Sequence, residues 1–176
     1  SIKCGQNSIK CRQNNIKNGK LLYRLLGVLL DSESDVWIVE GEKCADSLAE
    51  LGLVTITSGS SSSAESADWS HLSNRRVVIW PDNDEAGLRY AKAVTEQLIE
   101  IGCKVQWIDV SKVKCGDDAD GGDAVDWRLL HPDATKVDVE TLPLVDPELC
   151  KQEDIVTSSQ QGNNQSQLLD QIAASC

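Results

Sequence analysis

The sequence predicts an α/β fold, with a mainly parallel four-stranded sheet flanked by helices. Two observations support this prediction. Short apolar runs bounded by turn residues recur along the chain, and the stretches between them carry apolar residues at helical spacing. Strands that alternate with helices usually pair in parallel, because each helix carries the chain back to the starting edge of the sheet.

Four segments have the composition of buried strands. Three of them are short runs rich in valine and isoleucine, and the last one alternates apolar with polar residues. The expected strands are 36–39, 54–57, 76–80 and 104–110.

The helices are predicted from periodicity and from the residues that end them. The segment 43–51 precedes Gly52, and 85–101 precedes Gly102, so a glycine stands at each expected C-terminus. A brief helix over 125–130 is stopped by a proline, and 21–30 is a short helix or strand that leads into the domain. On the longest helix we expect one apolar face made of Leu88, Ala91, Val94, Leu98 and Ile101.

Composition divides the chain into three parts. Residues 1–20 form a polar, low-complexity leader with a short tandem repeat, 21–145 the folded domain, and 146–176 a linker or tail rich in Gln, Ser and Asn, with a stub of helix at 167–174. Methionine is absent, so we expect a processed chain or a piece of a longer product.

Charge and cysteine usage limit the function. The net charge of −11 argues against a protein that grips nucleic acid through a broad basic face. The seven cysteines contain no C-x-x-C pair, which excludes a zinc ribbon and favours reduced thiols in a cytoplasmic protein. No apolar stretch reaches the roughly 18 residues of a membrane span, so we expect no membrane partner.

Acidic residues follow two of the predicted strands at the point where each strand ends. Glu40 comes after 36–39, and Asp82 and Asp84 come after 76–80. Open α/β sheets bind their ligands at the carboxyl ends of their strands, and adjacent carboxylates repel unless a cation lies between them. The residues therefore predict a divalent-metal site. Asp84 is also a good N-cap for the following helix, so a purely structural reading stays open.

These motifs resemble those of a known family. The segments Glu-Gly-Glu-Lys-Cys-Ala-Asp at 40–46, Pro-Asp-Asn-Asp-Glu-Ala-Gly at 81–87 and Gly-Asp-Ala-Val-Asp-Trp at 122–127 occur in the order seen in Toprim domains. The closest resemblance is to Toprim domains of phage- and plasmid-type DNA primases and primase-helicases, and it covers residues 21–132. It implies a Rossmann-like Toprim fold and Mg²⁺-dependent nucleotidyl transfer, with Mn²⁺ as a substitute metal.

The resemblance also implies roles for individual residues. Glu40 is the expected catalytic acid or base; the expected metal ligands are Asp82, Asp84, Asp123 and Asp126. The expected phosphate or nucleotide contacts are Lys43, Gly41 and Gly87. Many relatives carry an acid where this chain has Cys44, so a second metal ion depends on whether Asp46 can reach the site.

The implied partners are a single-stranded DNA template, ribonucleotides and flanking primase or helicase domains of a mobile element. Three alternatives stay open: Toprim nuclease or topoisomerase chemistry, a non-catalytic replication-associated module, and a phosphatase of the haloacid-dehalogenase type. The phosphatase needs Asp82 as nucleophile and leaves Glu40-Gly41 unexplained.

Overall fold

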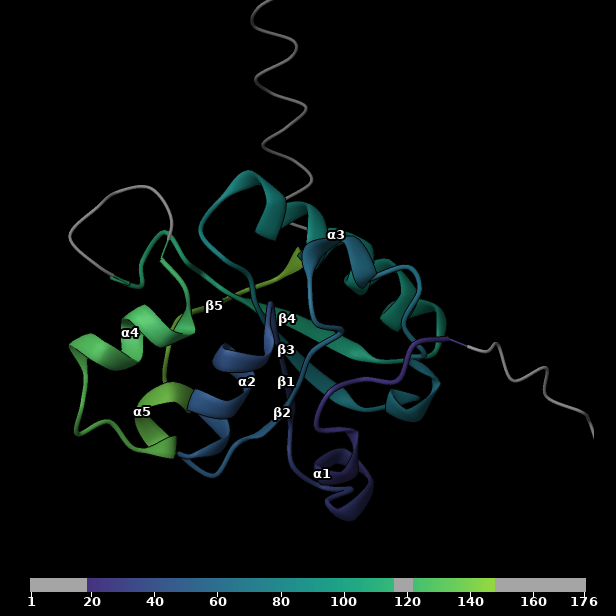
Figure 1. Cartoon of the computed structure of the whole chain (residues 1–176), viewed down its shortest axis with the longest axis horizontal. Helices are drawn as coiled ribbons and strands as arrows, with labels where there is room; N and C mark the ends of the chain where they lie inside the picture. The colour runs from purple at the N-terminus through teal and green to yellow at the C-terminus, as the bar shows by residue number, and fades with distance from the viewer. Residues whose placement is uncertain (1–18, 116–121, 148–176) are drawn as a thin grey trace, which may run out of the picture.

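A five-stranded, mostly parallel sheet forms the centre of the protein (Figure 1). The computed structural model describes residues 19–115 and 122–147. Strand order is β2-β1-β3-β4-β5, and the first four strands are parallel, which confirms the predicted α/β fold class. The strands are β1 Val36–Val39, β2 Val54–Ile56, β3 Arg76–Trp80, β4 Lys104–Ile108 and β5 Leu144–Val145.

The fifth strand corrects the predicted strand number. β5 pairs antiparallel with β4, with Trp107 opposite Val145 and Ile108 opposite Leu144. A strand of two residues has no readable alternation, so sequence periodicity cannot reveal it.

The helices predicted within the described residues form, with ends that shift by at most four residues. The helices are α1 Leu25–Leu30, α2 Glu42–Ala49, α3 Glu85–Glu100, α4 Ala124–Leu130 and α5 Lys136–Glu140. Two 3₁₀ turns, η1 Ser61–Ser63 and η2 Ser70–Leu72, lie between β2 and β3. The five-residue α5 was not predicted because it spans little more than one helical turn.

Helices cover both faces of the sheet and create two cores (Figure 1). On one face α1, η2 and α3 pack against alternate strand residues, among them Ile38 and Ile79. On the other face α2, α4 and α5 pack against the intervening ones, among them Trp37 and Trp80. The strand side chains alternate between faces, so short strands can be buried along their whole length.

One detail of the predicted helix face is wrong. Ala91, Val94 and Leu98 are buried in α3 as expected, but Leu88 is 39% exposed and Tyr90 is 1% exposed. The buried stripe is thus centred nearer to Tyr90 than the leucine positions indicate.

Residues before the first strand pair with the chain that follows β2. The Lys20 amide donates to the Ser66 carbonyl oxygen at 2.7 Å, and the Asp68 amide donates to the Lys20 carbonyl oxygen at 3.0 Å. Tyr23 forms an antiparallel bridge with Thr57, with its amide 2.9 Å from the Thr57 carbonyl oxygen. The backbone just after β2 and the segment between η1 and η2 are therefore paired with residues 20–23.

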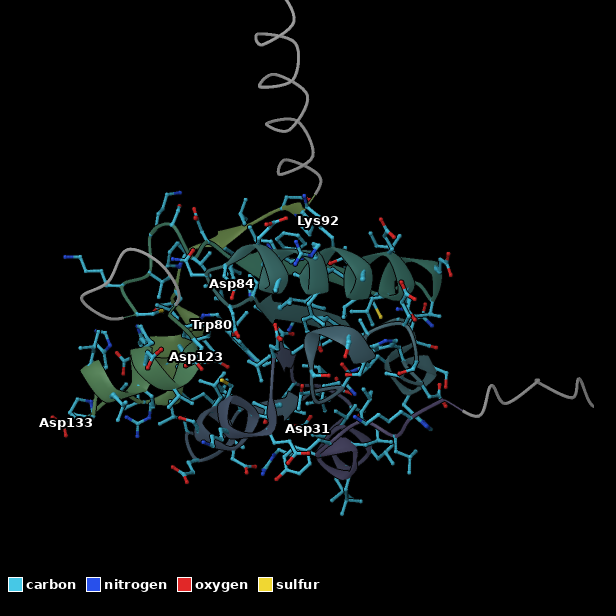
Figure 2. All side chains as sticks on the ribbon, turned by 45° about the horizontal axis from the view of Figure 1, so that its top comes forward. Asp31, Trp80, Asp84, Lys92, Asp123 and Asp133 are labelled. Carbon is cyan, nitrogen blue, oxygen red and sulfur yellow. The ribbon has the colours of Figure 1, made fainter. Side chains whose placement is uncertain are left out.

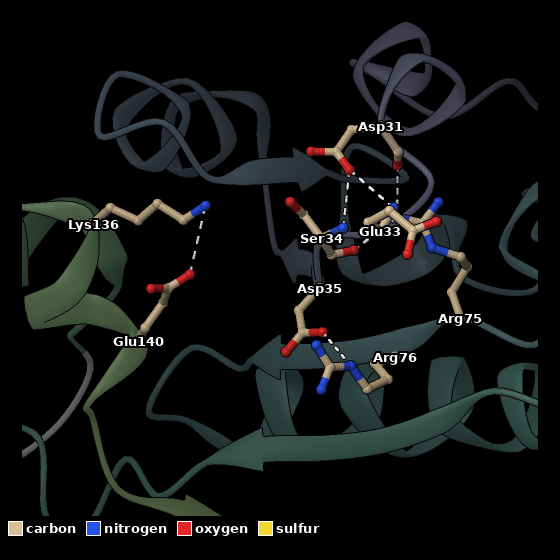
Figure 3. Close-up of polar contacts among 8 residues, drawn as sticks. All are labelled: Asp31, Glu33, Ser34, Asp35, Arg75, Arg76, Lys136 and Glu140. Carbon is tan, nitrogen blue, oxygen red and sulfur yellow. Dashed lines mark hydrogen bonds and ion pairs between the residues drawn. The ribbon is translucent and has the colours of Figure 1, made fainter.

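Two arginines tie together the amino ends of β1 and β3 (Figure 3). Arg75 Nη2 donates to the carbonyl oxygens of Asp31 and Ser34 at 2.8 and 2.7 Å, and Arg76 Nε lies 2.6 Å from Asp35 Oδ1. Because β1 and β3 are parallel, these contacts lie at the end opposite Glu40 and Asp82.

Several predictions lie outside the described residues. These are the leader up to residue 18, the acidic loop over 117–121, and the tail from 148 on with its helix at 167–174. Of the helices in the described ranges, none has the length and apolar character that crossing a membrane requires.

Candidate functional site

The carboxyl ends of β1 and β3 bring Glu40 and Asp82 to one edge of the sheet. The two strands are neighbours in parallel register, with Val39 opposite Trp80 at their last residues. The chain leaves β1 toward β2 on one side and later continues from β3 toward β4 on the other. This is the topological switch point, where open α/β sheets form their ligand-binding crevice.

A glycine and a threonine fix the backbone just after Glu40. Gly41 has φ +92°, a conformation that side chains disfavour, and it allows the chain to turn from β1 into α2. Its amide donates to Thr57 Oγ1 at 3.2 Å, and the Gly59 amide donates to the same oxygen at 3.0 Å. The fully buried Thr57 thus joins the turn after β1 to the turn after β2.

The turn after β3 holds Asp82 against the start of α3. The Asp84 amide donates to the Asp82 carbonyl oxygen at 2.8 Å, and Asp84 Oδ1 accepts from the Gly87 amide at 2.7 Å. Asp84 is therefore the N-cap of α3, as its sequence position indicates. A Cβ on Gly87 would lie 2.5 Å from the Asp82 carbonyl oxygen, so the helix can approach Asp82 this closely only with glycine there.

A third acidic segment lies beside this turn. Asp123 Oδ1 accepts from the amides of Val125 and Asp126 at 2.7 and 2.9 Å, and Asp126 Oδ2 accepts from the Asp123 amide at 3.2 Å. This reciprocal arrangement is a capping box at the start of α4. The capping role alone is enough to explain the positions of both acids.

Two long-range contacts bring this third segment to the sheet edge. The Asn83 amide donates to the Gly122 carbonyl oxygen at 3.2 Å. Trp127 of α4 packs edge-on against Trp80 of β3, with ring centroids 5.7 Å apart and both side chains buried. Figure 2 shows Asp84, Trp80 and Asp123 in one region of the molecule, away from Asp31 and Asp133.

The electrostatic centre of the site is Asp82. Its pKa is raised from 3.8 to about 7, first by burial and then by the negative charges of Glu40, Asp123, Asp84 and Asp126, in that order. The other four acids predicted as catalytic or metal-binding residues thus all act on Asp82, although the five acids come from three separate segments. A cation bound among these carboxylates would relieve their mutual repulsion.

Two thiols adjoin the same acids. Burial, the charge of Asp123 and a hydrogen bond to it raise the pKa of Cys44 to about 12. Burial and the charges of Asp123, Asp126 and Asp82 raise the pKa of Cys115 to about 11. In the metal-free protein both thiols are therefore protonated at neutral pH.

Asp46 points away from the acidic residues. Its carboxylate accepts from Tyr23 Oη at 3.0 Å and from Arg24 Nη1 at 2.7 Å. Lys43, also in α2, is exposed on the first turn. The helix thus turns Cys44, and not Asp46, toward Asp123.

The acidic side chains do not by themselves form a complete set of metal ligands. Within 19–115 and 122–147, no three His, Cys, Asp or Glu side chains lie close enough together to hold a metal ion. Mg²⁺ usually takes one or two carboxylates and completes its shell with water and substrate phosphates, so the oxygen ligands and the charge around Asp82 fit this ion.

The comparison with protein families agrees with this geometry. A sequence model of a family described as Toprim-like matches residues 37–121. The chain contains a Toprim-like domain. The matched range of this Toprim-like domain holds Glu40, Asp82 and Asp84, while Asp123 and Asp126 lie just beyond it. A comparison with curated proteins gives no match.

Sequence reasoning missed some residues that support the Toprim-like site. Ser58 Oγ and the Tyr90 hydroxyl lie 3.0 Å apart and are buried, and the charge of Glu40 adds to the burial that raises the pKa of Tyr90. Ser63 Oγ in turn lies 3.1 Å from Ser58 Oγ. Tyr90 lies four residues before Val94, and this helical spacing could have predicted that Tyr90 is on the buried face of α3. No comparable pattern in the sequence points to the two serines.

Proposed function

We propose that this Toprim-like domain is the nucleotidyl-transfer centre of a DNA primase or primase-helicase, which joins ribonucleotides on a single-stranded DNA template. The observation that carries the proposal is that Glu40 and Asp82 follow neighbouring parallel strands at the switch point of the sheet, where the charges of Glu40, Asp123, Asp84 and Asp126 all act on Asp82. Toprim-like domains serve metal-dependent nucleotidyl and phosphodiester chemistry, and the motif sequences at 40–46 and 81–87 favour the primase type.

The metal would be held chiefly by Asp82, with water and substrate phosphates completing its shell, and the charges of Asp84 and Asp123 would favour the cation from nearby. When bound, Mg²⁺ neutralises charge on the phosphates and on the leaving oxygen. Asp82 must lose its proton before it can act as a ligand, and its raised pKa makes that loss dependent on pH near 7. Asp84 and Asp123 keep their helix caps, so the backbone of the site need not rearrange.

We assign the general-base role to Glu40 in this proposal. It ends β1 beside the turn that holds Asp82, and its charge acts on Asp82 directly. In the reaction, the 3′-hydroxyl of one nucleotide gives its proton to Glu40 while its oxygen bonds to the α-phosphorus of the next. The bond to pyrophosphate breaks and pyrophosphate leaves with its electron pair. Gly41 and Thr57 hold the backbone next to Glu40 and so limit its movement.

The first test is an NMR titration of the chain with Mg²⁺, followed by trace Mn²⁺. We expect selective shifts and broadening at Glu40, Asp82 and Asp84 that Asp82→Asn removes. Asp133→Asn, in an exposed turn, is the matched control and should leave them intact. Absence of localised binding at ~10 mM, well above weak Mg²⁺ affinities, would leave the acids as turn and cap residues of a non-catalytic module.

A second test measures the reaction itself. Wild type should form short primers from ribonucleoside triphosphates on single-stranded DNA once flanking domains are supplied, and Glu40→Gln should abolish synthesis without loss of Mg²⁺ binding. If Glu40→Gln retains full synthesis, the general-base role is wrong. If the wild type cleaves the DNA instead of extending on it, the centre belongs to a nuclease.

A further inference from the structure

A pocket of about 460 Å³ lies beside the acidic residues, between the η1 turn and the first half of α3. One wall comes from the serine-rich turn, with Ser62 and Glu65 at its rim, and the other from α3, with Arg89 at its rim. The pocket does not include the acids themselves.

The pocket and the acidic site share a wall. Tyr90 lines the pocket, and its hydroxyl lies in the buried contact with Ser58 on which the charge of Glu40 acts. Ala86, another lining residue, follows the N-cap Asp84 by two positions on the same helix. A molecule in the pocket can therefore extend past the start of α3 toward Asp82.

Hydrogen bonds hold the wall on the η1 side in place. The Ala64 carbonyl oxygen accepts from Trp69 Nε1 at 2.9 Å and from Gln97 Nε2 at 3.0 Å, and the second of these bonds joins the turn to α3. Ser63 Oγ lies 2.7 Å from the carbonyl oxygens of both Ser58 and Ser60. The pocket is thus preformed, which lowers the entropic cost of binding.

The residues that line the pocket suit a small molecule with a flat apolar ring and polar groups at its edges. Three of the lining residues have small side chains that leave space for a ring: Ala64, Ala86 and Ala93. At the rim, Glu65 offers an acceptor for sugar hydroxyls and Arg89 a donor for phosphate or base oxygens. Arg89 pairs with Glu85 at 2.5 Å, but both are exposed, so the pair is weak and the guanidinium can turn to a ligand.

We propose that this pocket binds the sugar and base of the ribonucleoside triphosphate whose phosphates react beside Asp82. The volume lies in the range of about 300–1,000 Å³ of small-molecule sites. The inference rests on the proposed nucleotidyl transfer, and it adds the place where the nucleoside is held.

The test uses the full chain and NMR titrations with each ribonucleoside triphosphate in turn, in the presence of Mg²⁺. Nucleotide should shift the amide signals of Ala64 and Ala93, whereas inorganic triphosphate should shift only signals at the acids. Ala93→Leu fills the pocket two turns away from the acids and should weaken nucleotide binding at least about tenfold, equal to ~1.4 kcal/mol. Ala49→Leu adds the same bulk to α2, outside the pocket, and should leave the affinity unchanged.

A second variant keeps the test independent of core packing. Glu65→Gln lies at the exposed rim and should weaken nucleotide binding about fivefold through one lost charged hydrogen bond, with the fold intact. Equal nucleotide affinities in wild type, Ala93→Leu and Glu65→Gln would overturn the pocket assignment. So would the absence of shifts at Ala64 and Ala93.

Failure of the pocket and failure of the proposed function give different results. Broadening by Mn²⁺ at Asp82 without nucleotide shifts in the pocket would refute the pocket alone. Nucleotide shifts in the pocket without metal binding would support the pocket as a nucleotide site and refute the nucleotidyl-transfer centre.

Discussion

Replacement of Asp82 by Asn should stabilise the metal-free protein at high pH. The pKa of Asp82 is about 7 in the folded protein against about 3.8 when the chain is unfolded. Between these values the folded state holds a proton that the unfolded state has lost, so wild-type stability falls as pH rises from about 4 to about 7. Asparagine carries no charge at any pH and avoids this loss.

The size of the effect follows from the pKa difference. At 1.36 kcal/mol per pH unit the difference corresponds to ~4 kcal/mol, and we halve it to ~2 kcal/mol because water partly reaches and screens Asp82. With a urea m-value of about 2 kcal/mol/M, the unfolding midpoint of Asp82→Asn should lie about 1 M above that of wild type at pH 8. Most of this gain should be absent at pH 4.5.

The assay is urea unfolding at both pH values with EDTA present, and Asp133→Asn serves as the control for loss of an exposed aspartate. A variant that is destabilised at pH 8, or that gains equally at both pH values, would refute the reasoning. Added Mg²⁺ should reverse the order at pH 8, because only the wild type gains stability from binding the ion.

Three further predictions concern the same site. Mg²⁺ affinity of the wild type should fall about tenfold per pH unit below pH 7, as protons compete for Asp82; calorimetry that finds equal affinities at pH 6 and 8 would remove Asp82 from the ligand set. Gly87→Ala should lose ~1–3 kcal/mol by overpacking against the Asp82 backbone, while Gly27→Ala, which meets no atom within 4 Å, should gain ~0.5–1 kcal/mol. Thermal unfolding compares them, and a similar change in both would contradict the close approach. Asp123→Ala should cost ~1 kcal/mol by loss of the α4 cap, whereas Asp123→Asn should keep the stability and weaken Mg²⁺ binding; equal stability of the two in urea would show that the cap contributes nothing.

The parts of the fold that were predictable have strong local signals. β1 and β3 were predicted with the observed bounds because each is an apolar run ended by an acid or a proline. β5 and α5 are too short for periodicity, and the pairing of β5 with β4 is a tertiary effect.

The site was predictable only in part. The sequence indicated that Glu40 and Asp82 share a sheet edge, since parallel strands end together. It did not indicate that Asn83 bonds to Gly122 or that Trp127 packs on Trp80, and these contacts bring Asp123 within electrostatic range of Asp82. Such distant pairings depend on the assembled core. The inward orientation of Cys44 and the outward one of Asp46 likewise follow from how α2 packs.

The contacts that residues 20–23 make near the edge strand β2 determine how far the domain can be shortened at its N-terminus. The matched family range begins at residue 37, yet Tyr23 pairs with the backbone of Thr57 directly after β2, and Lys20 pairs with the backbone of Ser66 and Asp68. A fragment trimmed to that range would expose open amide and carbonyl groups beside an apolar strand, which invites sheet-to-sheet aggregation. A fragment that keeps these backbone pairs therefore has to begin at or before residue 20.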